Sequence, residues 1–430
     1  MRPTRLREAH IHLAWHARMK QVARGSLAHC QSQAETLDMV REAVADHDPG
    51  KPSIVLLTDA RPESWAEASF PALADLDAAA GNRPVVLRTF DYHSMMVSSA
   101  ALALAQIDDR TRDPEGGRIV RDGEYQPTGV LLEAACRPIN ALFNLDRVDA
   151  GDLWHMLLNE PFSEFHDMLA SPELGPALQH VAKYDRDRVD GFLRPYLNFQ
   201  LHFGIDVLEA AVDAARSWRS DTLHLAGGKI FVDGTLNSRT AWMNEPYADG
   251  PPEHRAGMAL MKHAAIEDAI RKCHSHGVRL ACHAIGDGAV RAVLDAVERV
   301  RPPRWTVRIE HAEVIDAADV PRFAELGVIA SVQPCHLLVD IEALGRAIPD
   351  RLNRVLPLRS LIDDGLEPGR TLLFGSDAPI VRPDPEDSIR AAVHRSRVDS
   401  VAIAPEQAIS EAEAWACFAA DRRMPDIGGD

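Results

Sequence analysis

The chain has 430 residues, of which 46% are hydrophobic and 26% are charged, a composition typical of a globular protein with a large core. The 64 acidic residues outnumber the 47 basic ones, which gives a formal net charge of -17. This charge argues against a nucleic acid or an anionic membrane as partner, because both bind basic patches. No apolar run approaches the ~20 residues that a membrane-spanning helix needs.

The six cysteines lie far apart and form no CxxC pair, and no apolar signal-peptide segment follows the first residues. Both features are typical of a cytoplasmic protein with reduced thiols. We therefore expect a cytoplasmic location.

The first half of the chain has an irregular pattern. Segment 8–13 (EAHIHL) reads as a short strand, and 53–59 and 84–91 are further predicted strands. The stretch from about 134 to 220 is expected to be mostly helical. No repeat, low-complexity tract or linker divides the chain into domains.

The second half alternates regularly between apolar runs and amphipathic segments. The runs are 227–234, 278–288, 306–313, 327–334 and 371–379, each ending in a polar or glycine-containing turn. Strands that alternate with helices predict a parallel sheet whose strands are buried on both faces.

The spacing favours one (β/α)8 TIM barrel over residues 1–430. His10 and Lys229 lie 219 positions apart, whereas three plain βα steps need roughly 100 residues. We therefore expect largely helical insertions within about 13–220, around barrel strands 2 and 3, and a terminal helix and tail over 409–430.

Polar residues fall at or near the carboxyl ends of the predicted strands, which form the active-site face of such a barrel. Imidazoles and carboxylates are common ligands of zinc, iron and manganese. The residues are His10, His12, Lys229, His283, His311 and Asp377.

The HxH pair has a physical explanation. Side chains alternate along a strand, so His10 and His12 face the same way while Ile11 faces the opposite way. Two such imidazoles can chelate one metal. Taken alone, the pair also fits two buried histidines that are held by hydrogen bonds.

Lys229 and Asp377 each allow two interpretations. Lys229 lies in GGKIFVDG, where burial would depress its pKa and favour reaction with carbon dioxide, but its amine could also pair with Asp233. Asp377 lies in FGSDAP, where it could bind metal and accept a proton, or could simply form a turn. The combination of five polar strand ends favours a two-metal hydrolytic site.

The sequence resembles the amidohydrolase superfamily, and within it amidohydrolase family 3, the branch that includes N-substituted formamide deformylases. The resemblance covers residues 8 to about 394, with little from 137–220. It rests on stretches such as GGKIFVDGTLNSRTAWMNEPYAD, CHAIGDGAVRAVLDAVE, VRIEHAEVI and LLFGSDAPI.

The resemblance implies a binuclear metal centre. His10, His12 and Asp377 would hold one divalent metal, His283 and His311 the other, and Lys229 would bridge them as a carbamate formed with carbon dioxide. Zinc is the expected metal, with iron or manganese as alternatives.

The implied reaction is cleavage of a C–N bond in a small amide, formamide or cyclic amide. Metal-bound hydroxide would attack the carbonyl carbon, and Asp377 would carry the proton to the leaving amine. His93, in DYHSMM, would face the substrate, and Arg239 and His336 would line the pocket.

The sequence departs from the family pattern in three regions. The β-sandwich that most members build from segments before the HxH strand and after the last barrel helix is expected to be missing, and no usual second-strand segment is found. A second copy of the chain could cover the surface that the sandwich leaves bare.

Two alternative functions stay open. One is a single-metal deaminase of the same superfamily, although such an enzyme needs no bridging Lys229. The other is a non-catalytic paralogue that serves as a binding protein, although a dead site has no reason to keep all six ligand-type residues.

Overall fold

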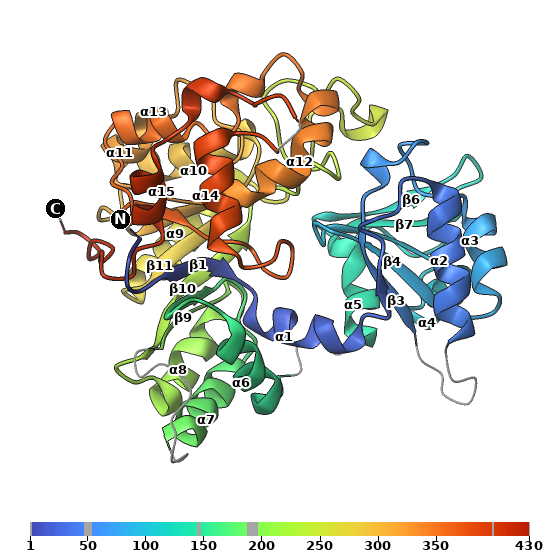
Figure 1. The fold of residues 1–430 in the computed structure, drawn as a ribbon, viewed down its shortest axis with the longest axis horizontal. Helices are drawn as coiled ribbons and strands as arrows, with labels where there is room; N and C mark the ends of the chain where they lie inside the picture. Colours follow the sequence, from blue (N-terminus) through green and yellow to red (C-terminus); the bar gives the residue numbers. More distant parts are fainter. Residues whose placement is uncertain (1, 47–53, 144–147, 187–196, 398–399, 430) are drawn as a thin grey trace. The chain divides into compact units, whose positions relative to one another are not determined.

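The structure of the protein is a computed structural model, which describes residues 2–46, 54–143, 148–186, 197–397 and 400–429 (Figure 1). The chain divides into two compact units, one made of Met1–Arg18 and Asp146–Asp430 and the other of Met19–Leu145. Each unit is built on a β-sheet of its own.

The first unit contains eight parallel strands that follow one another in chain order around the sheet. Ile11 forms a parallel bridge to Ala378, which brings the first strand next to the last one. The sheet is thus nearly closed, and the predicted TIM barrel is confirmed. Its strands are β1 (Arg7–Ile11), β8 (Glu164–Asp167), β9 (Asn198–Gly204), β10 (Leu223–Phe231), β11 (Arg279–Ala284), β12 (Val307–His311), β13 (Ile329–Val332) and β14 (Leu372–Phe374).

Helices surround the barrel strands (Figure 1). In α10 (Asp287–Val300), the residues Val290, Val293, Leu294 and Val297 recur at helical spacing, and all four are buried. The other helices are α1 (Leu13–Val22), α6 (Ala150–Asn159), α7 (Leu174–Arg186), α8 (Leu208–Trp218), α9 (His263–Ser275), α11 (Arg322–Leu326), α12 (Pro334–Ala347), α13 (Leu358–Asp363), α14 (Pro385–His394) and α15 (Glu411–Cys417). None of the helices in the described ranges is both long and apolar enough to cross a bilayer.

The second unit contains a six-stranded sheet in the order β2-β3-β4-β5-β7-β6. Figure 1 shows α2 and α3 on one face of this sheet and α5 on the other. A separate apolar core joins β3 and β4 to α2 and α3. The elements are β2 (Gly25–Ser26), α2 (Gln33–Ala45), β3 (Val55–Ala60), α3 (Leu73–Ala80), β4 (Val85–Thr89), β5 (Ser94–Val97), α4 (Ser99–Leu104), β6 (Gly117–Arg121), β7 (Pro127–Glu133) and α5 (Arg137–Leu142).

The structure corrects the expected insertion. The segment apart from the barrel is Met19–Leu145, which lies within the expected range of about 13–220, but it is α/β rather than largely helical. The predicted strands at 53–59 and 84–91 are found as β3 and β4, but they belong to this second sheet. The stretch 134–220 contains α5–α8 and also the two barrel strands β8 and β9; its residues 144–147 and 187–196 lie outside the described residues.

The GGK motif reflects close packing between β10 and β11. A Cβ atom on Gly227 would overlap the backbone carbonyl of Arg279, which lies opposite it in the register. A Cβ on Gly228 would lie 2.7 Å from the Cys273 sulfur. The two glycines therefore allow β10 to approach its neighbours directly before Lys229.

A glycine substitution tests this packing. Gly227→Ala should lower the free energy of unfolding by more than about 2 kcal/mol, because the new methyl group meets backbone rather than a side chain that can move. Gly345→Ala is the control, since Gly345 lies exposed in α12 with nothing near its Cβ position, and alanine should stabilise the helix by up to about 1 kcal/mol. Urea unfolding of both variants measures the difference, and equal stabilities would contradict the account.

Candidate metal centre

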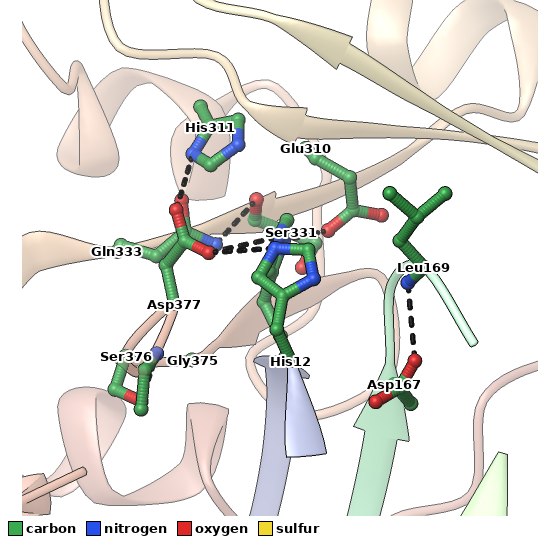
Figure 2. Close-up of polar contacts among 12 residues, drawn as sticks. His12, Asp167, Leu169, Glu310, His311, Ser331, Gln333, Gly375, Ser376 and Asp377 are labelled. Atoms are coloured by element: carbon green, nitrogen blue, oxygen red, sulfur yellow. Dashed lines mark hydrogen bonds and ion pairs between the residues drawn. The ribbon is translucent and has the colours of Figure 1, made fainter. Parts of the chain in front are cut away.

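Two imidazoles and one carboxylate converge at the seam between β1 and β14. The Nε2 atoms of His10 and His12 lie 3.3 and 3.2 Å from Oδ1 of Asp377. The potential ligand atoms of these three residues all lie within 4.8 Å of one another. Figure 2 shows His12 and Asp377 directed toward each other from the two chain segments. The structure thus brings together the three residues predicted for one metal.

The remaining predicted histidines continue this cluster along the barrel mouth. The ring of His311 lies 4.8 Å from that of His10 and 4.5 Å from that of His283, measured between centroids. Nδ1 of His311 lies 4.0 Å from Oδ2 of Asp377, and Nε2 of His283 lies 3.1 Å from the Gly234 carbonyl oxygen. A connected group of imidazoles therefore runs from β1 to β11.

Lys229 lies in β10 with 2% of its surface exposed. Its amine lies over the Phe231 ring, 5.1 Å from the centroid, and has no hydrogen-bond partner in the described part of the chain. Asp233 instead accepts the backbone N–H groups of Trp242, Ile285 and Gly286. The alternative pairing of Lys229 with Asp233 is thus not formed.

Two of these residues adopt a left-handed backbone conformation. His311 has φ 70° and Asp377 has φ 62°, a conformation that residues other than glycine adopt uncommonly. Adjacent residues of a regular strand face opposite ways, yet Glu310 and His311 both reach His10. Such local strain is typical of sites that position functional groups.

Glu8 joins the loop that carries Asp377 to the first strand. Its Oε1 accepts the backbone N–H groups of His10 and Ser376 at 3.1 and 2.8 Å, and the Asp377 N–H donates to the His10 carbonyl at 2.8 Å. A Cβ on Gly375 would lie 2.5 Å from the His10 nitrogen. Glycine at this position therefore lets the two segments meet.

The arrangement fits a divalent cation. Four buried polar atoms of the group have no hydrogen-bond partner among the described residues: His10 Nε2, His311 Nδ1, Lys229 Nζ and Asp377 Oδ1. Leaving buried polar atoms unsatisfied is costly, so such atoms indicate an additional partner. Imidazole nitrogens and a carboxylate oxygen are the donor set that zinc, iron and manganese accept.

The environment favours the metal-binding protonation states. Burial lowers the pKa of His10 to about 4, and burial with the neighbouring His283 and His10 rings lowers that of His311 well below its usual value. Burial also lowers the pKa of the Lys229 amine. For Asp377, burial alone would raise the pKa, but the His10 and His12 imidazoles outweigh it and keep the carboxyl below its usual range.

The three predicted substrate residues have different surroundings. His336 begins α12, with its ring 6.1 Å from that of His311 and its Nε2 3.3 Å from the Ser376 carbonyl oxygen. Arg239 donates to both oxygens of Asp249 at 2.7 and 2.6 Å. His93 lies in the second unit, where its Nδ1 is 2.7 Å from Oε2 of Glu133. Substrate contact by these three stays a prediction.

Sequence reasoning missed several buried polar residues around the site. Glu310 lies 2.8 Å from His10 Nδ1 and is itself bound by Arg308. Asp167 ends β8, where its carboxylate accepts the N–H group of Leu13 and that of Leu169 (Figure 2). The signal for Glu310 was present in RIEH, because alternating charged residues in a buried strand require internal partners.

A nearly closed parallel barrel with imidazoles and a carboxylate at its carboxyl edge is an arrangement typical of TIM-barrel enzymes that bind a divalent metal. The chain belongs to the amidohydrolase family, within amidohydrolase family 3: the family profile matches residues 6–158 and 196–422.

Curated relatives support this assignment. The chain is similar to the protein LONG AFTER FAR-RED 3 of Arabidopsis thaliana (29% identical, over 90% of this chain and 67% of that protein). It is similar to the putative amidohydrolase YtcJ of Bacillus subtilis (31% identical, over 77% of this chain and 63% of that protein). It is also similar to the N-substituted formamide deformylase of Arthrobacter pascens (28% identical, over 80% of this chain and 65% of that protein). The chain thus spans about two thirds of the length of these relatives.

Solved structures share the fold. An uncharacterized metal-dependent hydrolase from Pyrococcus horikoshii matches with a TM-score of 0.67 and 23% identity, over 96% of this chain and 78% of that one. One from Pyrococcus furiosus matches with a TM-score of 0.64 and 25% identity, over 96% and 80%.

Removal of the Asp377 carboxylate tests the metal centre. Asp377→Asn should lower the affinity for Zn²⁺ or Mn²⁺ by more than about tenfold, because a neutral amide is a poorer ligand than a carboxylate. Chelator competition with the metal-free protein measures this affinity. Asp319→Asn is the control, since Asp319 is equally buried but binds Arg291 and Arg322. Equal affinities in both variants would contradict the site.

Proposed function

We propose that this protein hydrolyses the C–N bond of an amide, formamide or cyclic amide in a small molecule, with a divalent metal as cofactor. The observation that carries the proposal is the convergence of His10, His12 and Asp377 beside the His311–His283 pair. The family and its formamide-deformylase relative support the choice of bond.

The metal would be held by the side chains of His10, His12, His283, His311 and Asp377, with Lys229 between the two groups. When bound, a divalent metal acts as a Lewis acid that lowers the pKa of water toward ~7 and polarises a carbonyl group. We expect zinc, with iron or manganese as alternatives, because the donor set suits all three.

Asp377 is the proposed proton carrier. It is ionised, since its pKa lies below the usual range for a carboxyl, so it can accept a proton from the nucleophilic water. The same carboxyl can then donate that proton to the nitrogen of the leaving amine, which leaves as a neutral product. His93, which lies in the second unit, stays a predicted substrate residue.

Lys229 is proposed to react with carbon dioxide. Burial favours the neutral amine, whose nitrogen lone pair can form a bond to the carbon of carbon dioxide as one N–H proton is released. The product is a carbamate with two oxygen donors, in place of a single amine nitrogen. This change would allow one side chain to reach both groups of ligands.

A substrate panel tests the reaction. Metal-reconstituted protein is incubated with N-formyl, N-acyl and cyclic amides, and release of the amine is measured. We expect turnover of at least one class, and loss of turnover in metal-stripped protein and in Asp377→Asn. Ammonia release from amino-substituted rings by a protein with one metal would instead indicate a deaminase. Metal binding without turnover of any amide would contradict the proposal.

Lys229→Ala should lower kcat by more than about 100-fold, because the bridging oxygen donors are lost. Short carboxylic acids such as acetate or propionate should restore part of the rate by occupying the vacated space. Lys272→Ala is the control, since the Lys272 amine binds the Ile205 carbonyl and pairs with Glu209. A fully active Lys229→Ala protein would rule out the carbamate.

A further inference from the structure

Glu310 is a fully buried carboxylate that contacts a proposed metal ligand from behind. Its Oε2 lies 2.8 Å from Nδ1 of His10, and neither residue is exposed to solvent. The opposite ring nitrogen of His10, Nε2, is the one that faces Asp377. Glu310 and Asp377 thus lie on the two sides of the same imidazole.

Arg308 fixes the charge and the position of this carboxylate. Its Nε and Nη2 donate to both oxygens of Glu310, and Nη2 also donates to the Ala9 carbonyl and the Ser331 hydroxyl, each at 2.8 Å. Its Nη1 lies 2.9 Å from Nδ1 of His166. A guanidinium has only donors, and it binds both oxygens of Glu310, so this charged pair favours the ionised form of Glu310.

The hydrogen bond between His10 and Glu310 can then run in only one direction. An ionised carboxylate accepts hydrogen bonds but donates none, so Nδ1 of His10 carries the proton. In the neutral ring, Nε2 is left with a lone pair that faces Oδ1 of Asp377 at 3.3 Å. Two lone pairs in direct opposition repel each other unless a cation lies between them.

We propose that Glu310, held by Arg308, is a positioning residue that fixes the Nδ1–H tautomer of His10 and so presents its Nε2 to the metal. This inference rests on the proposed metal-dependent function. Histidine ligands commonly donate their second N–H group to a carboxylate, and loss of that carboxylate typically weakens metal binding 10–100-fold.

Glu310 and the proposed ligand His311 are neighbours in β12. The next residue is His311, whose left-handed backbone turns its ring toward the same site. One strand therefore supplies a ligand to one side of the cluster and orients a ligand on the other side. Loss of Glu310 should affect the metal at His10 and His12 more than the metal at His283 and His311.

Glu310→Gln tests the inference because an amide cannot satisfy both neighbours. If its oxygen accepts from His10, its NH₂ group opposes Nε of Arg308; if its NH₂ group faces His10, Nδ1 must accept and Nε2 becomes protonated. In the metal-free protein, the tautomer of His10 is read from long-range ¹H–¹⁵N spectra, with a His10→Gln variant for assignment. We expect the Nδ1–H form alone in the wild type and a mixture of both tautomers in Glu310→Gln.

Metal affinity provides the second measurement. Chelator competition should show a loss of about 10–100-fold for Glu310→Gln. Glu164→Gln is a matched control, because Glu164 also lies between an arginine, Arg7 at 2.6 Å, and a histidine, His166 at 2.8 Å, but touches no proposed ligand. It should retain wild-type affinity and the wild-type tautomer of His10.

Glu310→Asp covers the case in which the glutamine variant does not fold. It keeps an ionised acceptor, so the Nδ1–H form should persist and affinity should fall less than tenfold. An unchanged tautomer and affinity in folded Glu310→Gln would overturn the inference, as would an equal loss of affinity in Glu164→Gln. If the wild type binds no metal, the proposed function fails, while the tautomer spectra still decide the role of Glu310.

Discussion

The interior of the barrel is organised by the need to neutralise buried charge. Arg308 and Glu310 neutralise each other in β12, Glu310 holds His10 of β1, and His10 faces Asp377 after β14. On the other side, Arg308 reaches His166 of β8. Removing one partner from such a network leaves another buried group unsatisfied, which destabilises far more than a lost surface contact. The strands are thus tied together by the same contacts that orient the proposed metal ligands.

The sequence predicted the barrel and the convergence of the proposed ligand residues, because both follow from local patterns. Alternating strands and helices in the second half required a parallel sheet, and parallel strands bring their carboxyl ends to one edge. His283, His311 and Asp377 were therefore expected to meet the HxH pair, and the structure places them so. Two separated segments, β1 and the loop after β14, meet only through the closure of the sheet.

Other features could not be read from local pattern. Strands β8 and β9 are barrel strands, but they contain the polar residues Glu164, His166 and His202. Such residues are not expected in a buried strand, and the hydrogen bonds that satisfy them are known only from the folded structure. The second unit has strands of ordinary apolar pattern, and nothing local shows that they form a separate sheet. The stretch RIEH indicates that Glu310 needs a partner but not which one, since strand alternation directs Glu310 away from His311 and only the left-handed backbone at His311 brings both to His10.

The most direct test of the metal centre is anomalous X-ray diffraction from crystals grown with Zn²⁺ or Mn²⁺, recorded above and below the absorption edge of the metal. We expect an anomalous peak about 2.0–2.2 Å from Nε2 of His10, Nε2 of His12 and a carboxylate oxygen of Asp377, with a second peak beside His283 and His311. Metal-loaded crystals without a peak at His10, His12 and Asp377 would show that these residues do not bind the metal, and the proposed metal-dependent function would fail.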